Sequence, residues 1–107
     1  MLATKARSDE ITLSLPPGLA APLADALTHL RGGPSGARLT GEPPHELTGP
    51  RALVRELLAV ALDEAGERIG DASTRLLRGE DAAAELRALL SEASGLLALL
   101  EQSSAAP

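Results

Sequence analysis

Apolar and polar residues alternate near the start of the chain, in the segment ITLSL at residues 11–15. Alternation with a period of two places successive side chains on opposite faces of an extended chain. One face would carry Ile11, Leu13 and Leu15, and the other Glu10, Thr12 and Ser14. Two prolines follow at once and end the pattern. Residues 9–15 are therefore predicted to form a β-strand with a core face and a solvent face.

Beyond this strand the apolar residues recur at helical spacing. Between residues 18 and 31 a single stripe is formed by Leu19, Leu23, Leu27 and Leu30. Pro22 fits a helix only in its first turn, so this helix is predicted to begin near Ala20 or Ala21.

A second helix is predicted to begin at Pro50, with Thr48 as its N-cap and proline in its first turn. Its apolar face is wide enough to indicate burial on more than one side, and consists of Leu53, Val54, Leu57, Leu58, Ala61, Leu62, Ala65 and Ile69. Gly66 and Gly70 weaken the far end. The pattern leaves open whether the helix ends at Gly70 or continues to Leu77.

A last helix is predicted at about residues 82–101, after a stop at Gly79 and with Asp81 as its cap. Its apolar positions are spaced alternately by three and four residues, and the resulting seam consists of Leu86, Leu89, Ala93, Leu96 and Leu100. A seam of two heptads suits packing against another helix better than a free coiled coil.

The segment 32–49 holds five glycines and three prolines and is predicted to be a loop, with a short extended piece at 37–40 as an option. The expected fold class is mainly α, with an N-terminal strand followed by helices and a C-terminal helical hairpin. Four parts follow from this division: a flexible arm at 1–8, a strand-and-helix domain at 9–69, a helical oligomerisation or partner-binding region at 70–102, and a frayed tail at 103–107.

Composition adds little to the fold but limits the chemistry. The 107 residues include no Phe, Tyr, Trp or Cys, which excludes disulfides and thiolate chemistry. The net charge is −5, with +1 in residues 1–55 and −6 in residues 56–107, so an anionic partner would bind the front half. No signal peptide or membrane-spanning pattern is found, and a cytoplasmic protein without membrane contact is expected.

Residue patterns that carry catalysis or bind metal are not found. His29 and His45 lie 16 residues apart without cysteines or an H-E-x-x-H motif, and are interpreted as surface histidines. The glycines of the loop lack the lysine of a P-loop, and no serine stands in a G-x-S-x-G motif. A protein that is not an enzyme, with no metal and no cofactor, is expected.

The predicted strand needs a partner, because a single strand leaves its backbone N–H and C=O groups unpaired. It could pair with residues 37–40, receive another protein at its edge, or pair with the same strand of a second copy in a symmetric dimer. The third option makes the order of elements informative. A strand ITLSLP, a helix that opens at a proline, and a polar-capped helix with the segment ALVRELLAVAL resemble the ribbon-helix-helix DNA-binding proteins of the Arc, MetJ and CopG type, over residues 8–65 without the loop.

This resemblance implies a homodimer whose paired strands enter the major groove of DNA. Glu10, Thr12 and Ser14 would then read bases. Phosphates would be bound by Lys5, Arg7, Thr48, Gly49 and Arg51. The dimer core would consist of Ile11, Leu13, Leu15, Val54, Leu57, Leu58 and Leu62. Two features differ from the family: the long segment between the helices, and a glutamate at position 10, which near phosphates repels.

Two hypotheses of function follow. The first is a dimeric DNA-binding transcriptional regulator, and specifically an antitoxin if the acidic C-terminal region binds a toxin. It requires residues 10–15 to pair across a twofold axis, and pairing of this strand within its own chain would contradict it. The second is a helical protein–protein interaction or adaptor module that does not bind nucleic acid and works through the acid-rich back half and its leucine seam.

Overall fold

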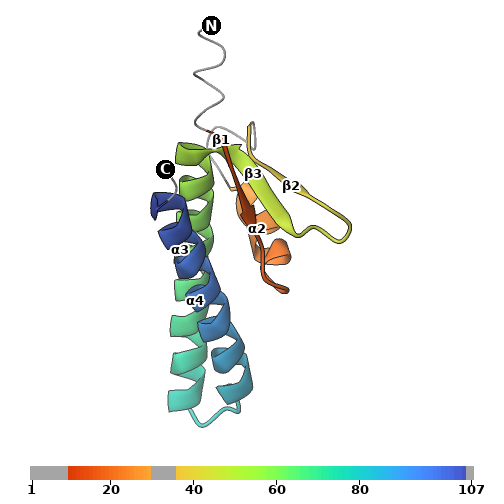
Figure 1. The fold of residues 1–107 in the computed structure, drawn as a ribbon. Coiled ribbons are helices and arrows are strands. Elements are labelled where there is room, and N and C mark those ends of the chain that lie inside the picture. The colour runs from red at the N-terminus through yellow and green to blue at the C-terminus, as the bar shows by residue number, and fades with distance from the viewer. Residues whose placement is uncertain (1–9, 30–35, 106–107) are drawn as a thin grey trace, which may run out of the picture.

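A computed structural model describes residues 10–29 and 36–105 of the chain. In order, the elements are strand β1 (Glu10–Ser14), helix α2 (Ala20–Leu27), strands β2 (Arg38–Thr40) and β3 (Glu46–Pro50), and helices α3 (Arg51–Leu77) and α4 (Ala83–Ala105). Helices α3 and α4 form a long antiparallel hairpin, and the sheet and α2 lie beside one end of it (Figure 1). The described part of the chain is therefore mainly helical with a strand ahead of the helices, as the sequence predicts.

The three strands form one antiparallel sheet in the order β1-β3-β2. In the register of β1 and β3, Ile11 lies opposite Gly49 and Leu13 opposite Leu47. The backbone N–H of Leu15 donates to the carbonyl of His45 at 2.8 Å and continues this pairing past the end of β1. Strand β1 was correctly predicted because its alternation matches a sheet with one buried face: Leu13 and Leu15 are buried, whereas Glu10, Thr12 and Ser14 are exposed.

The prediction of a loop over residues 32–49 is wrong where the structure describes this segment, because it contains β2 and β3. The optional extended piece at 37–40 corresponds to β2. The sequence pattern does not predict strand β3, because only one of its apolar side chains packs in the core. That side chain is Leu47, which is fully buried. The glycine and proline content instead marks the tight turn between the two strands, where Gly41 has φ +103°.

The partner of β1 also differs from the expectation of a twofold ribbon. Strand β1 pairs with β3 of its own chain, which is neither residues 37–40 nor a second copy. This pairing within the chain differs from the twofold ribbon that the resemblance implies, and DNA binding stays a prediction. The pairing satisfies one edge of β1 within the chain, and β3 then bonds β2 on its other edge.

Helix α2 begins at Ala20, as predicted, and places Pro22 in its first turn. Helix α3 begins at Arg51 with Pro50 as N-cap and without a capping side chain, so Thr48 is not the cap. It runs through Gly66 and Gly70 to Leu77, which resolves the alternative left open by the sequence. The far end stays helical because Ile69 and Ala72 pack with residues of α4, which offsets the cost of about 1 kcal/mol per helical glycine.

The turn between α3 and α4 is a Schellman motif. Gly79 has φ +87°, its N–H donates to the carbonyl of Leu76 at 3.0 Å, and the N–H of Glu80 donates to Arg75 at 3.0 Å. Glycine favours this left-handed conformation, which confirms Gly79 as the stop. Beside the turn, Arg75 forms a hydrogen bond of 2.5 Å to Glu85. This contact is the main cause that raises the pKa of Arg75 above its ordinary value.

The core has two parts. The larger contains buried residues of β1, α2, β3, α3 and α4, among them Leu13, Leu23, Leu47, Leu57 and Leu96. The smaller lies between the distal halves of α3 and α4 and has only Ala72, Ala82 and Leu89 as buried members. The sheet and α2 contribute nothing to this second cluster, so the distal hairpin is two helices thick.

The C-terminal end of α4 corrects the prediction of a frayed tail at 103–107, as far as residue 105. Helix α4 continues to Ala105, and Ser103 is fully buried. Its hydroxyl donates to the carbonyl of Leu100 at 2.7 Å and accepts a hydrogen bond from Arg55 at 3.0 Å. Arg55 therefore binds the end of α4 to the first turns of α3.

Candidate functional site

The exposed face of the sheet carries the three residues predicted to read bases. Glu10, Thr12 and Ser14 do project from one face of β1, but their neighbours belong to the same chain. The hydroxyls of Thr12 and Thr48 lie 3.1 Å apart, and Glu10 lies 3.8 Å from Arg38 of β2. This face is polar and of mixed charge, which is a weak basis for binding phosphates.

The residues predicted to bind phosphate are only partly brought together. Thr48 and Gly49 belong to β3, whereas Arg51 is the first residue of α3 and is half-buried. Lys5 and Arg7, with the predicted flexible arm, lie outside the described residues. The three placed residues adjoin along the chain, but Thr48 is bonded across the sheet and does not cap the helix.

Gly49 has a structural role that the sequence does not reveal. A Cβ at this position would lie 2.6 Å from the carbonyl oxygen of Gly36 and 2.9 Å from the Cα of Ala37. The absent side chain is what lets the backbone before β2 approach β3. Gly49 therefore serves close packing of the sheet, and its contact with phosphate stays a prediction.

The residues predicted to form a dimer core are packed within one chain. Leu13, Leu15, Val54, Leu57 and Leu58 are buried, and Ile11 and Leu62 are half-buried against them. Their burial needs no second copy. The C-terminal seam likewise packs on α3 in the same chain: Leu89 and Leu96 are buried, and Leu86, Ala93 and Leu100 are half-buried.

The hairpin has two sides, which can be told apart from the contacts. Glu64 and Gly95, each just before a buried residue of its helix, face the sheet side: Glu64 contacts His29, and a Cβ at Gly95 would meet Leu19 at 3.0 Å. In an α-helix the residue before a buried position and the residue after it lie on opposite flanks of that position. The residues that follow Ala65 and Leu96 therefore face away from the sheet side. Since α3 and α4 are antiparallel, these following residues lie on the same side of the hairpin, away from α2.

This side, here called the outer hairpin face, carries no charged residue along its centre. It consists of Leu62, Gly66, Ile69 and Ser73 from α3 and Leu86, Leu90, Ala93 and Leu97 from α4. The side chains of Leu90 and Leu97 are 52% and 50% exposed, respectively. No described element covers the face (Figure 1). Sequence reasoning merged it with the buried seam, because both are apolar and adjacent on the same helices.

Comparison with known proteins gives no relative: no family model, curated protein or solved structure matches the chain. Among the described residues, no helix has the length and apolar character required to cross a membrane.

Proposed function

We propose that this chain is a non-enzymatic helical assembly module that pairs with a second copy of itself through the outer hairpin face. The observation that carries the proposal is an uncharged helical surface with half-exposed leucines, Leu90 and Leu97, on the side away from the sheet. Leu90 and Leu97 lie seven residues apart on α4, and leucines at this spacing on one helix are typical of surfaces that pack against further helices.

The thin distal core supports the need for a partner. Past α2 only two alanines and one leucine of the described hairpin are buried, although its exposed and half-exposed positions hold Leu86, Leu90 and Ile69. Apolar area of this kind gains about 25 cal/mol per Å² when it leaves water. A second hairpin would turn two layers into a four-helix bundle and enclose these side chains.

A second copy is the occupant that the dimensions favour. From Leu62 to Ser73 the face spans about 17 Å at 1.5 Å per residue, and side chains extend it to about 22 Å. Two helices about 10 Å apart give a width of about 20 Å. Each protomer would bury about 440 Å², so the pair would bury about 900 Å², which is the size of a weak interface. Such a dimer would form at micromolar concentration.

DNA binding by the sheet is the alternative, and two observations count against placing it first. Strand β1 is paired within its own chain, and the exposed sheet face combines Glu10 and Glu46 with a single basic residue, Arg38. DNA binding draws most of its affinity from basic residues near phosphates. A toxin on the acidic region stays a prediction and would compete for the same hairpin.

Sedimentation equilibrium at about 5 to 200 µM tests the proposal. We expect the wild-type chain to be a dimer at the higher concentrations and the double variant Leu90→Lys, Leu97→Lys to be a monomer with unchanged circular dichroism. Ala84→Lys, at an exposed position two residues after a buried one, is the matched control and should still dimerise. A wild-type monomer throughout this range would overturn the proposal. A gel shift with DNA that weakens steeply with salt and survives the double variant would favour the alternative.

A further inference from the structure

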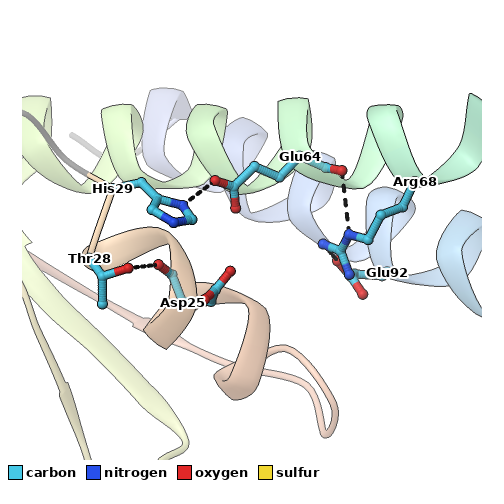
Figure 2. A network of polar contacts seen from close by, with 6 residues as sticks. All are labelled: Asp25, Thr28, His29, Glu64, Arg68 and Glu92. Carbon is cyan, nitrogen blue, oxygen red and sulfur yellow. Dashed lines mark hydrogen bonds and ion pairs between the residues drawn. The ribbon is translucent and has the colours of Figure 1, made fainter.

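Three side chains that can bind metal meet where the end of α2 approaches α3. One candidate donor atom from each of Asp25, His29 and Glu64 lies within 4.8 Å of the other two. The Nδ1 of His29 contacts the Oε2 of Glu64, and the carboxylate of Asp25 faces the same space from α2 (Figure 2). The cluster joins residues 35 positions apart in the sequence.

The backbone holds these side chains in place. Asp25 and His29 are four residues apart, a spacing that puts two side chains on one face of a helical turn. The turn is maintained past the end of α2, because the N–H of Thr28 donates to the carbonyl of Asp25 at 3.1 Å and that of His29 donates to Ala26 at 2.9 Å. Ala26 is fully buried, so this turn is packed on the core.

Glu64 reaches the cluster from the opposite wall. It precedes the buried Ala65 in α3 and therefore points to the α2 side of the hairpin. Its side chain is 24% exposed and that of His29 is 52% exposed. The cluster is thus open to solvent on one side, which leaves room for water or another ligand on a bound ion.

The charges around the cluster favour a cation. With a neutral imidazole, Asp25 and Glu64 give the cluster a charge of −2. Arg68 is near, but its guanidinium donates to Glu92 at 3.0 Å and to the backbone carbonyl of Glu64 at 3.4 Å (Figure 2). The charge of Arg68 is therefore paired with Glu92. A divalent ion would neutralise the carboxylates of Asp25 and Glu64 at once.

The donor set matches a borderline transition metal. Zn²⁺ binds imidazole nitrogen and carboxylate oxygen at about 2.0–2.2 Å, so two donors on one ion lie about 3–4 Å apart. The separations in the cluster allow this with small changes in side-chain torsion. Imidazole selects against Mg²⁺ and Ca²⁺, which prefer oxygen donors alone.

We infer that Asp25, His29 and Glu64 form a three-ligand site for a divalent transition metal of the Zn²⁺ type. The ion joins α2 to α3, so that α2 is held to the hairpin by coordination as well as by apolar packing. The remaining coordination positions face solvent. The alternative is a structural ion pair between a protonated His29 and Glu64, with no affinity for metal.

Titration of the metal-free full chain with Zn²⁺ by calorimetry, and with Co²⁺ by visible absorption, tests this inference. We expect one ion per chain, and at least a tenfold loss of affinity in His29→Ala and in Glu64→Gln. His45→Ala is the control, because His45 is also exposed, its ring Nδ1 lies 3.0 Å from the carbonyl oxygen of Pro43, and it is not part of the candidate cluster. It should bind as the wild type does.

A thermal melt gives a second readout. Zn²⁺ should raise the melting temperature of the wild type and of His45→Ala but not of His29→Ala, because only a folded site binds the ion. Absence of binding to the wild type at about 100 µM Zn²⁺ would overturn the inference. So would equal affinity in His29→Ala, or loss of binding in His45→Ala alone. Because all three ligands belong to one chain, these outcomes do not depend on dimerisation.

Discussion

Replacing Gly49 by alanine tests the packing of the sheet most directly. The added Cβ would lie 2.6 Å from the carbonyl oxygen of Gly36 and 2.9 Å from the Cα of Ala37. Ordinary contacts of carbon with oxygen and with carbon begin at about 3.3–3.5 Å, so the backbone at residues 36–37 must move away from β3 by about 0.6–0.7 Å. Both obstructing atoms belong to the backbone and cannot rotate aside.

The cost can be bounded. Overpacking of this kind destabilises by about 1–3 kcal/mol, whereas replacing glycine lowers the entropy of the unfolded chain and returns about 0.4–1 kcal/mol. The expected net loss in free energy of unfolding is about 1–2 kcal/mol. For a domain of this size each kcal/mol corresponds to about 4–8 °C, so the melting temperature should fall by about 5–15 °C.

Urea unfolding followed by circular dichroism measures this loss, and Gly70→Ala is the matched control. Gly70 is an exposed helical glycine with no atom within 4 Å of an added Cβ. The same substitution should there stabilise α3 by about 0.5–1 kcal/mol. Opposite signs at the two glycines are the expected result. A Gly49→Ala variant as stable as the wild type would refute the close approach of residues 36–37 to β3.

Two further predictions concern the core and the hairpin turn. Leu57 is fully buried in the larger core, so Leu57→Ala should lower the free energy of unfolding by about 2–5 kcal/mol in the same urea experiment; a loss below about 1 kcal/mol would place Leu57 outside the core. Glu85→Gln removes the hydrogen-bonded charge that raises the pKa of Arg75. Arg75 is protonated below its raised pKa, so the stabilisation is present at neutral pH and is lost only at strongly alkaline pH. A small decrease in melting temperature that vanishes in about 1 M NaCl is expected, and a decrease independent of salt would contradict an ionic origin.

Local patterns in the sequence predicted the elements whose signal is periodic. The alternation from Ile11 to Leu15 gave β1, and the spacing of leucines gave the helices, because both follow from which face is buried. Strand β3 has the segment ELTGP, in which one leucine carries the whole apolar signal. Its assignment depends on β1, some 36 residues earlier, which no local window contains.

The candidate sites were hidden for related reasons. The residues next to His29 in the sequence indicate a surface histidine without ligands beside it. Its contact with Glu64 comes from another helix, 35 residues away. The outer hairpin face was not separated from the buried seam, because Leu90 and Leu97 directly follow Leu89 and Leu96, and the composition of the helix is apolar on both sides. The packing of α4 on α3 decides which of these rows is covered: Leu89 and Leu96 face α3, whereas Leu90 and Leu97 do not.

The larger core unites the two ends of the described chain, since Leu13 and Leu15 of β1 belong to the same cluster as Leu96 and Leu99 of α4. On a ribosome, the first strand would be made long before the helix that completes its enclosure. Strand β1, with β3 and α2, keeps its leucines partly in water until α4 has emerged. Completion of the larger core is therefore a late step that depends on α4, and until then the nascent sheet is the segment most in need of protection from other chains.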